Sequence, residues 1–264
     1  MKHPIYHVNA FTGPAGTGNP AAICLLEQQQ PDHWLQAVAA QMNLSETAFV
    51  LPMAHGYSLR WFTPDREVEL CGHATLASAH VLRELGELKE GESVLFHTLS
   101  GELKARCEGA LIALDFPVTE ALACEAPSTL IEALGVTVLH SAKFGAKYLL
   151  ELETQAALLA AKPDMNALRA LPERGVCLTC RADSDEYDFI SRYFAPWVGI
   201  DEDPVNGSSH CALAPYWAKK MNKVEFKARQ ASRRGGELRL ALQDQRVAIC
   251  GAATTVLSGH LTLR

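Results

Sequence analysis

Hydrophobic and polar residues follow the same order of patterns in each half of the chain. The alternation that is typical of strands occupies residues 57–63 and again residues 188–194. A helical stretch that starts beside a glycine follows in each half, over residues 72–85 and residues 208–220. Two further strands follow each helix, at residues 102–106 and 111–114 in the first half and at residues 237–242 and 246–250 in the second. The chain therefore predicts two lobes that share one order of elements.

The two predicted helices are apolar on all sides, with the sequences ATLASAHVL and CALAPYWA. Because a helix of that kind is usually buried, we expect each lobe to be a mostly antiparallel sheet rolled around one central helix. This predicts an α/β (α+β) fold with two pseudo-symmetric lobes, residues 1–118 and residues 119–264. The last strand, residues 256–263, is free to pack on the first lobe. Outer helices are predicted at residues 32–42, 127–134 and 154–161.

Short repeated sequences point to the same two lobes. The sequence LRWFTP at residues 59–64 matches SRYFAP at residues 191–196, and CGH at residues 71–73 stands where NGS stands at residues 206–208. A third match pairs GELKARCEGALIAL with GELRLALQDQRVAI. Three matches in one order indicate an internal repeat. A pseudo-two-fold axis between the lobes would bring the two helix starts to face each other across a cleft.

Composition and charge argue against two classes of partner, nucleic acids and membranes. The 264 residues include 24 Lys and Arg against 30 Asp and Glu, a net charge of −6. A nucleic-acid partner favours a clustered basic surface, so we expect none. The longest apolar stretches are far shorter than the ~20 residues of a membrane-spanning helix, so we expect no membrane partner. The first residues, MKHPIYHVNAF, lack the apolar run of a secretory signal, which predicts a cytoplasmic location.

Eight cysteines are scattered through apolar runs, and a reducing cytoplasm keeps such residues as thiols. Cys177 and Cys180 are three residues apart on a predicted strand, so their side chains point to opposite faces and cannot share a metal. No second CxxC or HxxxH motif completes a zinc set. The sequence therefore predicts no disulfide and no metal site.

The two glycine-led helix starts offer a site for a small carboxylate substrate. Backbone N–H groups at Gly72 and Gly207 have no helical partner and lie at the positive ends of helix dipoles. The ordinary alternative is that both glycines only make tight turns.

Glu46 and His73 are the acid–base candidates. Glu46 lies where an amphipathic helix meets an apolar strand, and burial in a cleft there would suit it to proton transfer. The ordinary alternative is a surface Glu or a local cap. His73 lies at a helix start, where the dipole predicts a neutral, hydrogen-bonding imidazole. Its ordinary alternative is a structural histidine.

Four segments carry a resemblance that covers nearly the whole chain. They are NAFTGPAGTGNPAAICLL at residues 9–26, NLSETAFVL at 43–51, LRWFTPDREVELCGHATLASAHVL at 59–82 and DEDPVNGSSHCALAPYWA at 201–218. In this order they resemble the phenazine-biosynthesis PhzF family of isomerases. The resemblance implies the fold of diaminopimelate epimerase and proline racemase, which has two pseudo-symmetric lobes, each rolled around a central helix.

The resemblance also implies an activity. The family's best-known member isomerises trans-2,3-dihydro-3-hydroxyanthranilate without a cofactor. By this resemblance Glu46 moves a proton between ring carbons, and Asp203 and His73 hold the amino or hydroxyl group of the substrate or assist the proton shift. Amides near His73 and Ser208 hold the carboxylate, and Asn19 lines the site. The family further implies a homodimer.

Two departures from the family pattern bear on substrate fit: Asn206 stands in place of the usual Thr, and the loop at residues 13–20 differs.

Two alternatives to a Glu-based isomerase stay open. A racemase or epimerase with two thiols could use Cys71, but the residue at the matching place of the repeat is Asn206, and Cys211 lies one helical turn further on. The chain could also be a catalytically silent binding protein of the same fold. The natural substrate is not identified.

Overall fold

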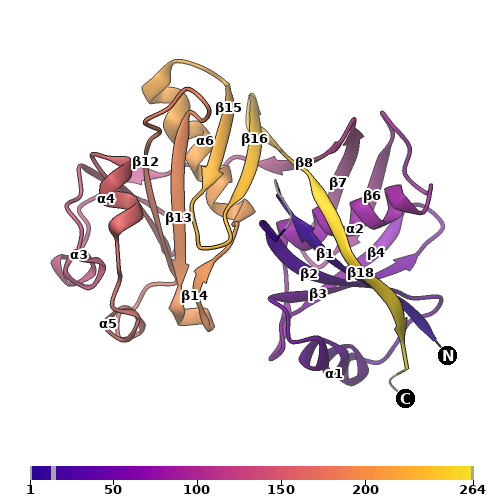
Figure 1. The fold of residues 1–264 in the computed structure, drawn as a ribbon. Helices are drawn as coiled ribbons and strands as arrows, with labels where there is room; N and C mark the ends of the chain where they lie inside the picture. Colours follow the sequence, from indigo (N-terminus) through magenta and orange to yellow (C-terminus); the bar gives the residue numbers. More distant parts are fainter. Residues whose placement is uncertain (1, 13–15, 263–264) are drawn as a thin grey trace. The chain divides into compact units, whose positions relative to one another are not determined.

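The chain forms two compact units in the computed structural model, which describes residues 2–12 and 16–262 (Figure 1). Unit 1 comprises the chain up to Phe116 and again from Ile249 onward, and unit 2 comprises Pro117–Ala248. The chain thus returns to unit 1 for its last strand. No helix among the described residues is long and apolar enough to cross a membrane.

Unit 1 holds two helices and a strongly curved sheet. The helices are α1 (Asp32–Met42) and α2 (Gly72–Glu84). The strands are β1 (His3–Ala10), β2 (Asn19–Leu25), β3 (Glu46–Pro52), β4 (Tyr57–Phe62), β5 (Glu67–Val68), β6 (Ser93–Thr98), β7 (Gly101–Glu108), β8 (Leu111–Pro117) and β18 (Ala253–Leu261).

Unit 2 repeats the plan with more outer helices. The helices are α3 (Ser128–Leu134), α4 (Gln155–Ala160), α5 (Met165–Arg169), the 3₁₀ turn Pro196–Val198 and α6 (Gly207–Met221). The strands are β9 (Leu122–Ala123), β10 (His140–Phe144), β11 (Lys147–Glu151), β12 (Gly175–Arg181), β13 (Phe189–Ala195), β14 (Ile200–Asp203), β15 (Glu225–Gln230), β16 (Gly236–Gln243) and β17 (Arg246–Gly251), which runs across the boundary into unit 1.

Strand pairing in the two units follows one scheme. In unit 1, β2 runs parallel to β3, β3 antiparallel to β4, β4 parallel to β6 and β6 antiparallel to β7. In unit 2 the same four relations join β11, β12, β13, β15 and β16. The internal repeat read from the sequence is therefore a repeat of topology, and the predicted fold class is confirmed.

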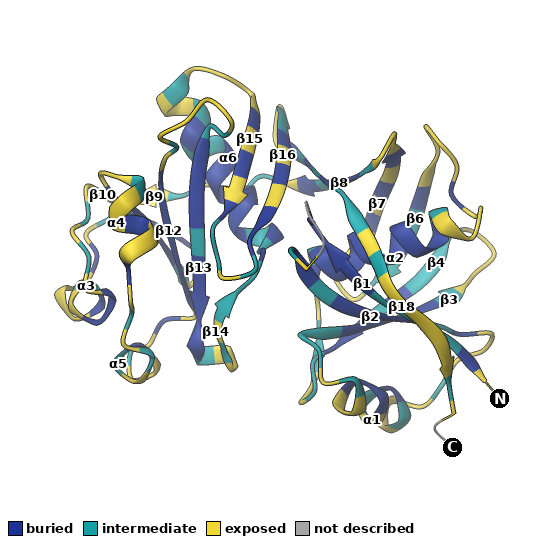
Figure 2. Ribbon diagram, viewed as in Figure 1, coloured by how far each residue is buried: buried dark blue, intermediate teal, exposed yellow. Residues whose placement is uncertain are grey.

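A largely buried helix occupies the centre of each unit, and dark blue marks the buried parts of α2 and α6 (Figure 2). In α2 every residue from His73 to Leu82 is buried, and the helix contacts β1, β2, β3, β7 and β18. The hydroxyls of Thr75 and Ser78 donate to carbonyls four residues back, so these polar groups are satisfied inside the core. Apolar residues on all sides thus produce the central helix that the sequence predicts.

The outer helices cover the opposite face of each sheet. In unit 1, Leu35 and Val38 of α1 pack with Phe49 of β3. In unit 2, Leu158 of α4 and Leu168 of α5 join the core beneath β11, β12 and β13. The helix α5 is missed by the sequence pattern, because its five residues are too few to show a helical period.

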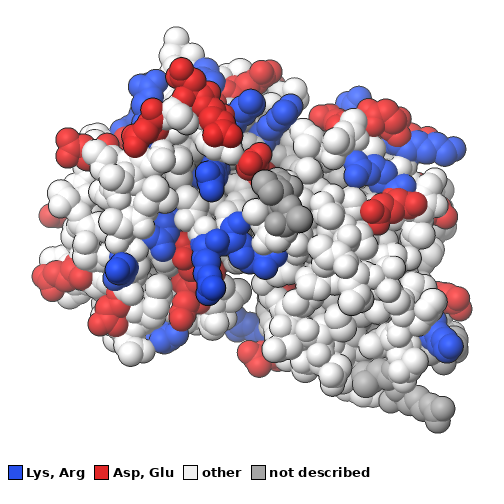
Figure 3. All heavy atoms as spheres, in the orientation of Figure 1, with Lys and Arg blue, Asp and Glu red and all other residues white. Residues whose placement is uncertain are grey.

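Charged side chains of both signs are interspersed on the face seen in Figure 3. Lys and Arg side chains lie beside Asp and Glu side chains there, and they form no unbroken basic surface on that face.

His210 is a buried titratable group in the core of unit 2. It lies on α6 and is fully buried, its ring stacks on Phe189, and its Nδ1–H donates to the carbonyl of Asn206 at 2.7 Å. Burial lowers the pKa of His210 to about 4. The folded protein therefore keeps this imidazole neutral over a pH range in which an unfolded chain takes up a proton.

Folding stability should therefore fall as the pH drops from about 6.5, the ordinary pKa of His, to about 4. The contribution of His210 is at most about 1.4 kcal/mol per pH unit and roughly 3 kcal/mol over the whole window. Denaturant unfolding at several pH values should show this slope in the wild type and its loss in His210→Gln. The exposed His33→Gln serves as the control and should keep the wild-type slope. Equal slopes in all three proteins would contradict the assignment.

Candidate active site

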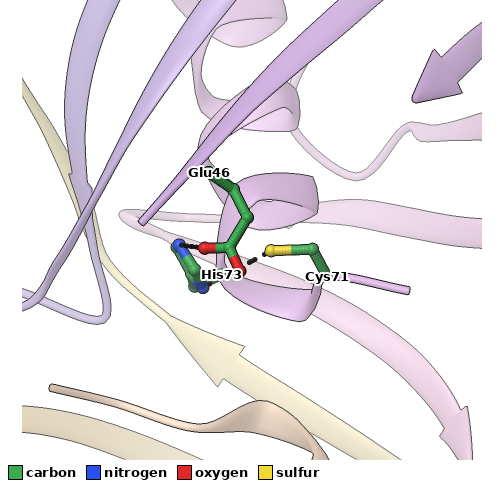
Figure 4. Close-up of side chains that lie close together, drawn as sticks. All are labelled: Glu46, Cys71 and His73. Atoms are coloured by element: carbon green, nitrogen blue, oxygen red, sulfur yellow. Dashed lines mark hydrogen bonds and ion pairs between the residues drawn. The ribbon is translucent and has the colours of Figure 1, made fainter. Parts of the chain in front are cut away.

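Glu46 and His73 meet at the start of the buried helix of unit 1 (Figure 4). The chain leaves α1 through Asn43, whose left-handed backbone ends the helix, and Glu46 then opens β3 beside β2. His73 is the second residue of α2. The His73 Nε2 and Glu46 Oε2 atoms are 3.2 Å apart, and the two side chains are only 8% and 13% exposed. Two residues that are far apart in the sequence thus form a buried acid–base pair.

The two facing atoms have no hydrogen-bond partner among the described residues, because their mutual contact is close but not aligned as a hydrogen bond. Buried polar atoms in folded proteins almost always have such a partner. The Glu46 oxygen and the His73 nitrogen both lack a hydrogen-bond partner. A ligand could therefore form a hydrogen bond with each of them. The pair therefore has the geometry of a site that a bound molecule completes.

The second ring nitrogen of His73 is held by its neighbours. Nδ1 lies 3.3 Å from the amide nitrogen of Asn19 and 3.5 Å from Sγ of Cys71. The Asn19 side chain also contacts the hydroxyl of Ser45 at 3.5 Å. An amide offers a donor at one end and an acceptor at the other, so Asn19 can serve Nδ1 whether or not that nitrogen carries a proton. Asn19 thus fixes the ring while leaving its protonation free to change.

His73 is not the neutral imidazole that the helix dipole predicts. Burial acts to lower the pKa of His73, but the charges of Cys71 in its thiolate form and of Glu46 raise it well above the ordinary value. Burial raises the pKa of the Cys71 thiol, so at neutral pH this residue is uncharged and the Glu46 carboxylate is the charge that acts. A full charge at 3.2 Å outweighs the partial charge of a helix end.

The predicted residues of unit 2 form a second set at the start of α6. The side chain of Asn206 accepts from the backbone N–H of Ser209 at 2.7 Å and from the Ser208 hydroxyl at 2.9 Å, and its amide donates to Asp203 Oδ2 at 2.8 Å. A Thr hydroxyl, which the family pattern has here, would have to make all three contacts from one oxygen atom, whereas Asn206 accepts at Oδ1 and donates from Nδ2. Asn206 therefore caps the helix and holds Asp203 at once.

Lys147 joins the same set and was not predicted from the sequence. Its ammonium donates to the Ser208 hydroxyl at 3.0 Å and lies over the ring of Tyr193. Burial lowers the pKa of Lys147, while Cys211, Asp203 and Cys177 act in the opposite direction. No carboxylate of the described chain comes within ion-pair distance of this ammonium, which leaves it free to bind an anion. No sequence signal marks Lys147, because only the pairing of β11 within unit 2 brings it to Ser208.

The starts of α2 and α6 share one further property. Neither helix has an acidic residue in its first turn, whereas α1 has Asp32 there. The free backbone N–H groups near Gly72 and Gly207 are thus not offset by a protein carboxylate within the helix. Both helix starts suit an anionic group of a ligand.

The predicted site residues thus fall into two sets. Asn19, Glu46 and His73 lie together in unit 1, and Asp203 and Ser208 lie together in unit 2 through Asn206. That the two sets act on one substrate remains a prediction, as does a homodimer. Of the loop at residues 13–20, residues 13–15 lie outside the described residues.

Comparisons with known proteins identify the family of the chain. Residues 8–259 match the PhzC-PhzF family, described as phenazine biosynthesis-like protein. The chain belongs to the PhzC-PhzF family. A relative from Halalkalibacterium halodurans, named an uncharacterized isomerase, is 49% identical over the full length of both chains. The structure of a PhzF family protein from Enterococcus faecalis has 39% identity, a TM-score of 0.95 and full coverage of both chains.

A more distant structure shows the wider fold. A hydroxyproline epimerase from Agrobacterium vitis has 13% identity and a TM-score of 0.62, with 98% of this chain and 92% of that chain covered. At that identity the likeness concerns the fold alone. The protein is therefore an isomerase of the PhzC-PhzF family with an epimerase-like fold.

Proposed function

We propose that this isomerase acts without a cofactor on a small substrate that carries a carboxylate, and that Glu46 transfers the proton. The observation that carries the proposal is the buried contact of Glu46 with His73, whose facing atoms lack hydrogen-bond partners among the described residues. Acid–base catalysis needs a titratable group that is shielded from water and still open to substrate. The burial of the pair meets the first condition, and the missing hydrogen-bond partners of its facing atoms support the second.

The proton path is as follows. The Glu46 carboxylate takes a proton from one carbon of the substrate, and the electron pair of that C–H bond enters the conjugated system. The resulting carboxylic acid returns a proton to another carbon, so Glu46 ends as it began. Positive charge on His73 offsets the negative charge that develops on the substrate between the two steps. The raised pKa of His73 supports this role.

The substrate carboxylate has candidate partners in unit 2. The Lys147 ammonium and the backbone N–H groups at the start of α6, beside Ser208, present positive and hydrogen-bond-donating groups close together. We further propose, from the internal repeat of the sequence alone, that this set and the Glu46–His73 pair act on one substrate. Asp203, held by Asn206, would hold an amino or hydroxyl group.

A racemase with two thiols has less support. Asn206 stands at the place of the second thiol, and its side chain is committed to capping α6. Cys211 donates to the carbonyl of Gly207 within its own helix, and burial raises its pKa to about 12. A silent binding protein would have no use for a buried carboxylate that lacks a hydrogen-bond partner.

Replacing Glu46 by Gln should lower kcat by about 10²–10⁴-fold, because the amide cannot accept the proton. The assay follows isomerisation of trans-2,3-dihydro-3-hydroxyanthranilate by NMR, with a panel of other small carboxylates if that compound does not react. Glu84→Gln is the matched control, since Glu84 also lies 3.2 Å from a histidine, His80, but outside the site. Equal turnover by Glu46→Gln and wild type would show that the base is another residue.

Replacing Lys147 by Met should raise KM for a carboxylate substrate by about 10- to 100-fold, because a hydrogen bond to a charged group contributes roughly 1.5–3 kcal/mol. The change in kcat should be smaller, since Lys147 does not move the proton. The exposed Lys162→Met controls for the loss of one positive charge. An unchanged KM in Lys147→Met would remove this residue from the binding site.

A further inference from the structure

The Glu46–His73 pair has a third member with a different chemistry. Cys71 precedes α2 directly, is only 6% exposed, and places its sulfur 3.5 Å from Nδ1 of His73. Three atoms that could bind a metal, one each from Glu46, Cys71 and His73, lie within 4.8 Å of one another (Figure 4). No other group of this kind occurs in the part of the chain that the structure describes. The sequence analysis names these residues singly and does not group them, since the carboxylate comes from β3 and the other two residues from the start of α2.

We propose that Glu46, Cys71 and His73 bind a thiophilic divalent cation, for which Zn²⁺ is the probe, and that this cation blocks the isomerase. A thiolate, an imidazole and a carboxylate are the donors that zinc takes in proteins, at about 2.0–2.3 Å. Ligands at those distances and a tetrahedral angle lie about 3.5 Å apart, which is the separation of Cys71 Sγ and His73 Nδ1. The inhibitory part of the proposal rests on the proposed function of Glu46.

The third ligand, Glu46, must move towards Cys71, because its oxygen faces Nε2 of His73 whereas the sulfur faces Nδ1, and the contact of Nδ1 with the Asn19 amide must give way to the cation. The Glu46 oxygen that faces His73 has no hydrogen-bond partner among the described residues, so a cation that recruits it breaks no hydrogen bond at that atom. Three protein ligands leave the fourth position of a tetrahedral cation to water or to a small anion. Binding releases the Cys71 proton, and any proton on the coordinating nitrogen of His73, to solvent.

The dipole of α2 opposes a cation at this place, but it amounts to about half an elementary charge. The Cys71 thiolate and the Glu46 carboxylate supply two full negative charges against it. The cation would act as an inhibitor rather than a cofactor, because it occupies the carboxylate that must carry the proton.

The test measures binding directly with Co²⁺, whose bond to a thiolate gives a charge-transfer absorption band. The reduced full-length protein should bind one Co²⁺ per chain with this band, and Zn²⁺ should displace it. The band should disappear in Cys71→Ser and in His73→Gln, and it should remain in Cys250→Ser, which removes another, half-buried thiol of unit 1. Thermal unfolding of each variant without metal shows whether it is folded.

A band that is absent from the wild type, or that persists in folded Cys71→Ser, would overturn the proposal. Zn²⁺ should also abolish isomerase turnover reversibly, with recovery on addition of a chelator, and undiminished turnover with Zn²⁺ bound would overturn the inhibitory part. Turnover in the absence of metal is a separate readout. If no carboxylate substrate reacts, the proposed function fails, while the Co²⁺ spectrum still decides whether the cation binds.

Discussion

A carboxylate and an imidazole that are buried against each other must be held in place by the rest of the fold. Removing both groups from water costs free energy, and their mutual attraction offsets that cost only in a fixed geometry. Here the fixed geometry comes from three elements of unit 1. Strand β3 supplies Glu46, the start of α2 supplies His73, and β2 supplies Asn19, which holds the second ring nitrogen. The contact is not aligned as a hydrogen bond, which leaves both facing atoms available to a ligand. The rolled sheet around a buried helix supplies the fixed geometry that such a buried pair needs.

Much of this fold could be predicted because its central helices are apolar on all sides and follow glycines. The outer helix α1 has the predicted bounds, and α2 and α6 differ from their predicted bounds by one residue at the ends. The repeated motifs predicted two units of one topology, which the strand pairings bear out. Short elements such as α5 and the two-residue strands β5 and β9 could not be predicted, because their conformation depends on the partners they pack against and not on a period of their own.

The site could be predicted in part. The residues that a motif or a helix start marks, such as Glu46 and His73, are brought together by the fold. Lys147 was missed as a site residue, because its importance comes only from a distance to Ser208 that no spacing in the sequence reveals. Cys71 was weighed only as a racemase thiol, because its distance to His73 is likewise not visible in the sequence. The protonation of His73 was predicted wrongly for the same reason. The helix dipole is visible in a sequence, whereas the nearby charge of a residue on another strand is not.

The central claim is that a side chain whose proton exchanges with solvent carries the hydrogen between two carbons. It is tested most directly by running the wild-type reaction in D₂O and locating deuterium in the product by NMR. A carboxylic acid at Glu46 would exchange its proton for deuterium, so the account predicts deuterium at the carbon that receives the proton. The same amount of deuterated product from Glu46→Gln would contradict it, because another group would then carry the proton.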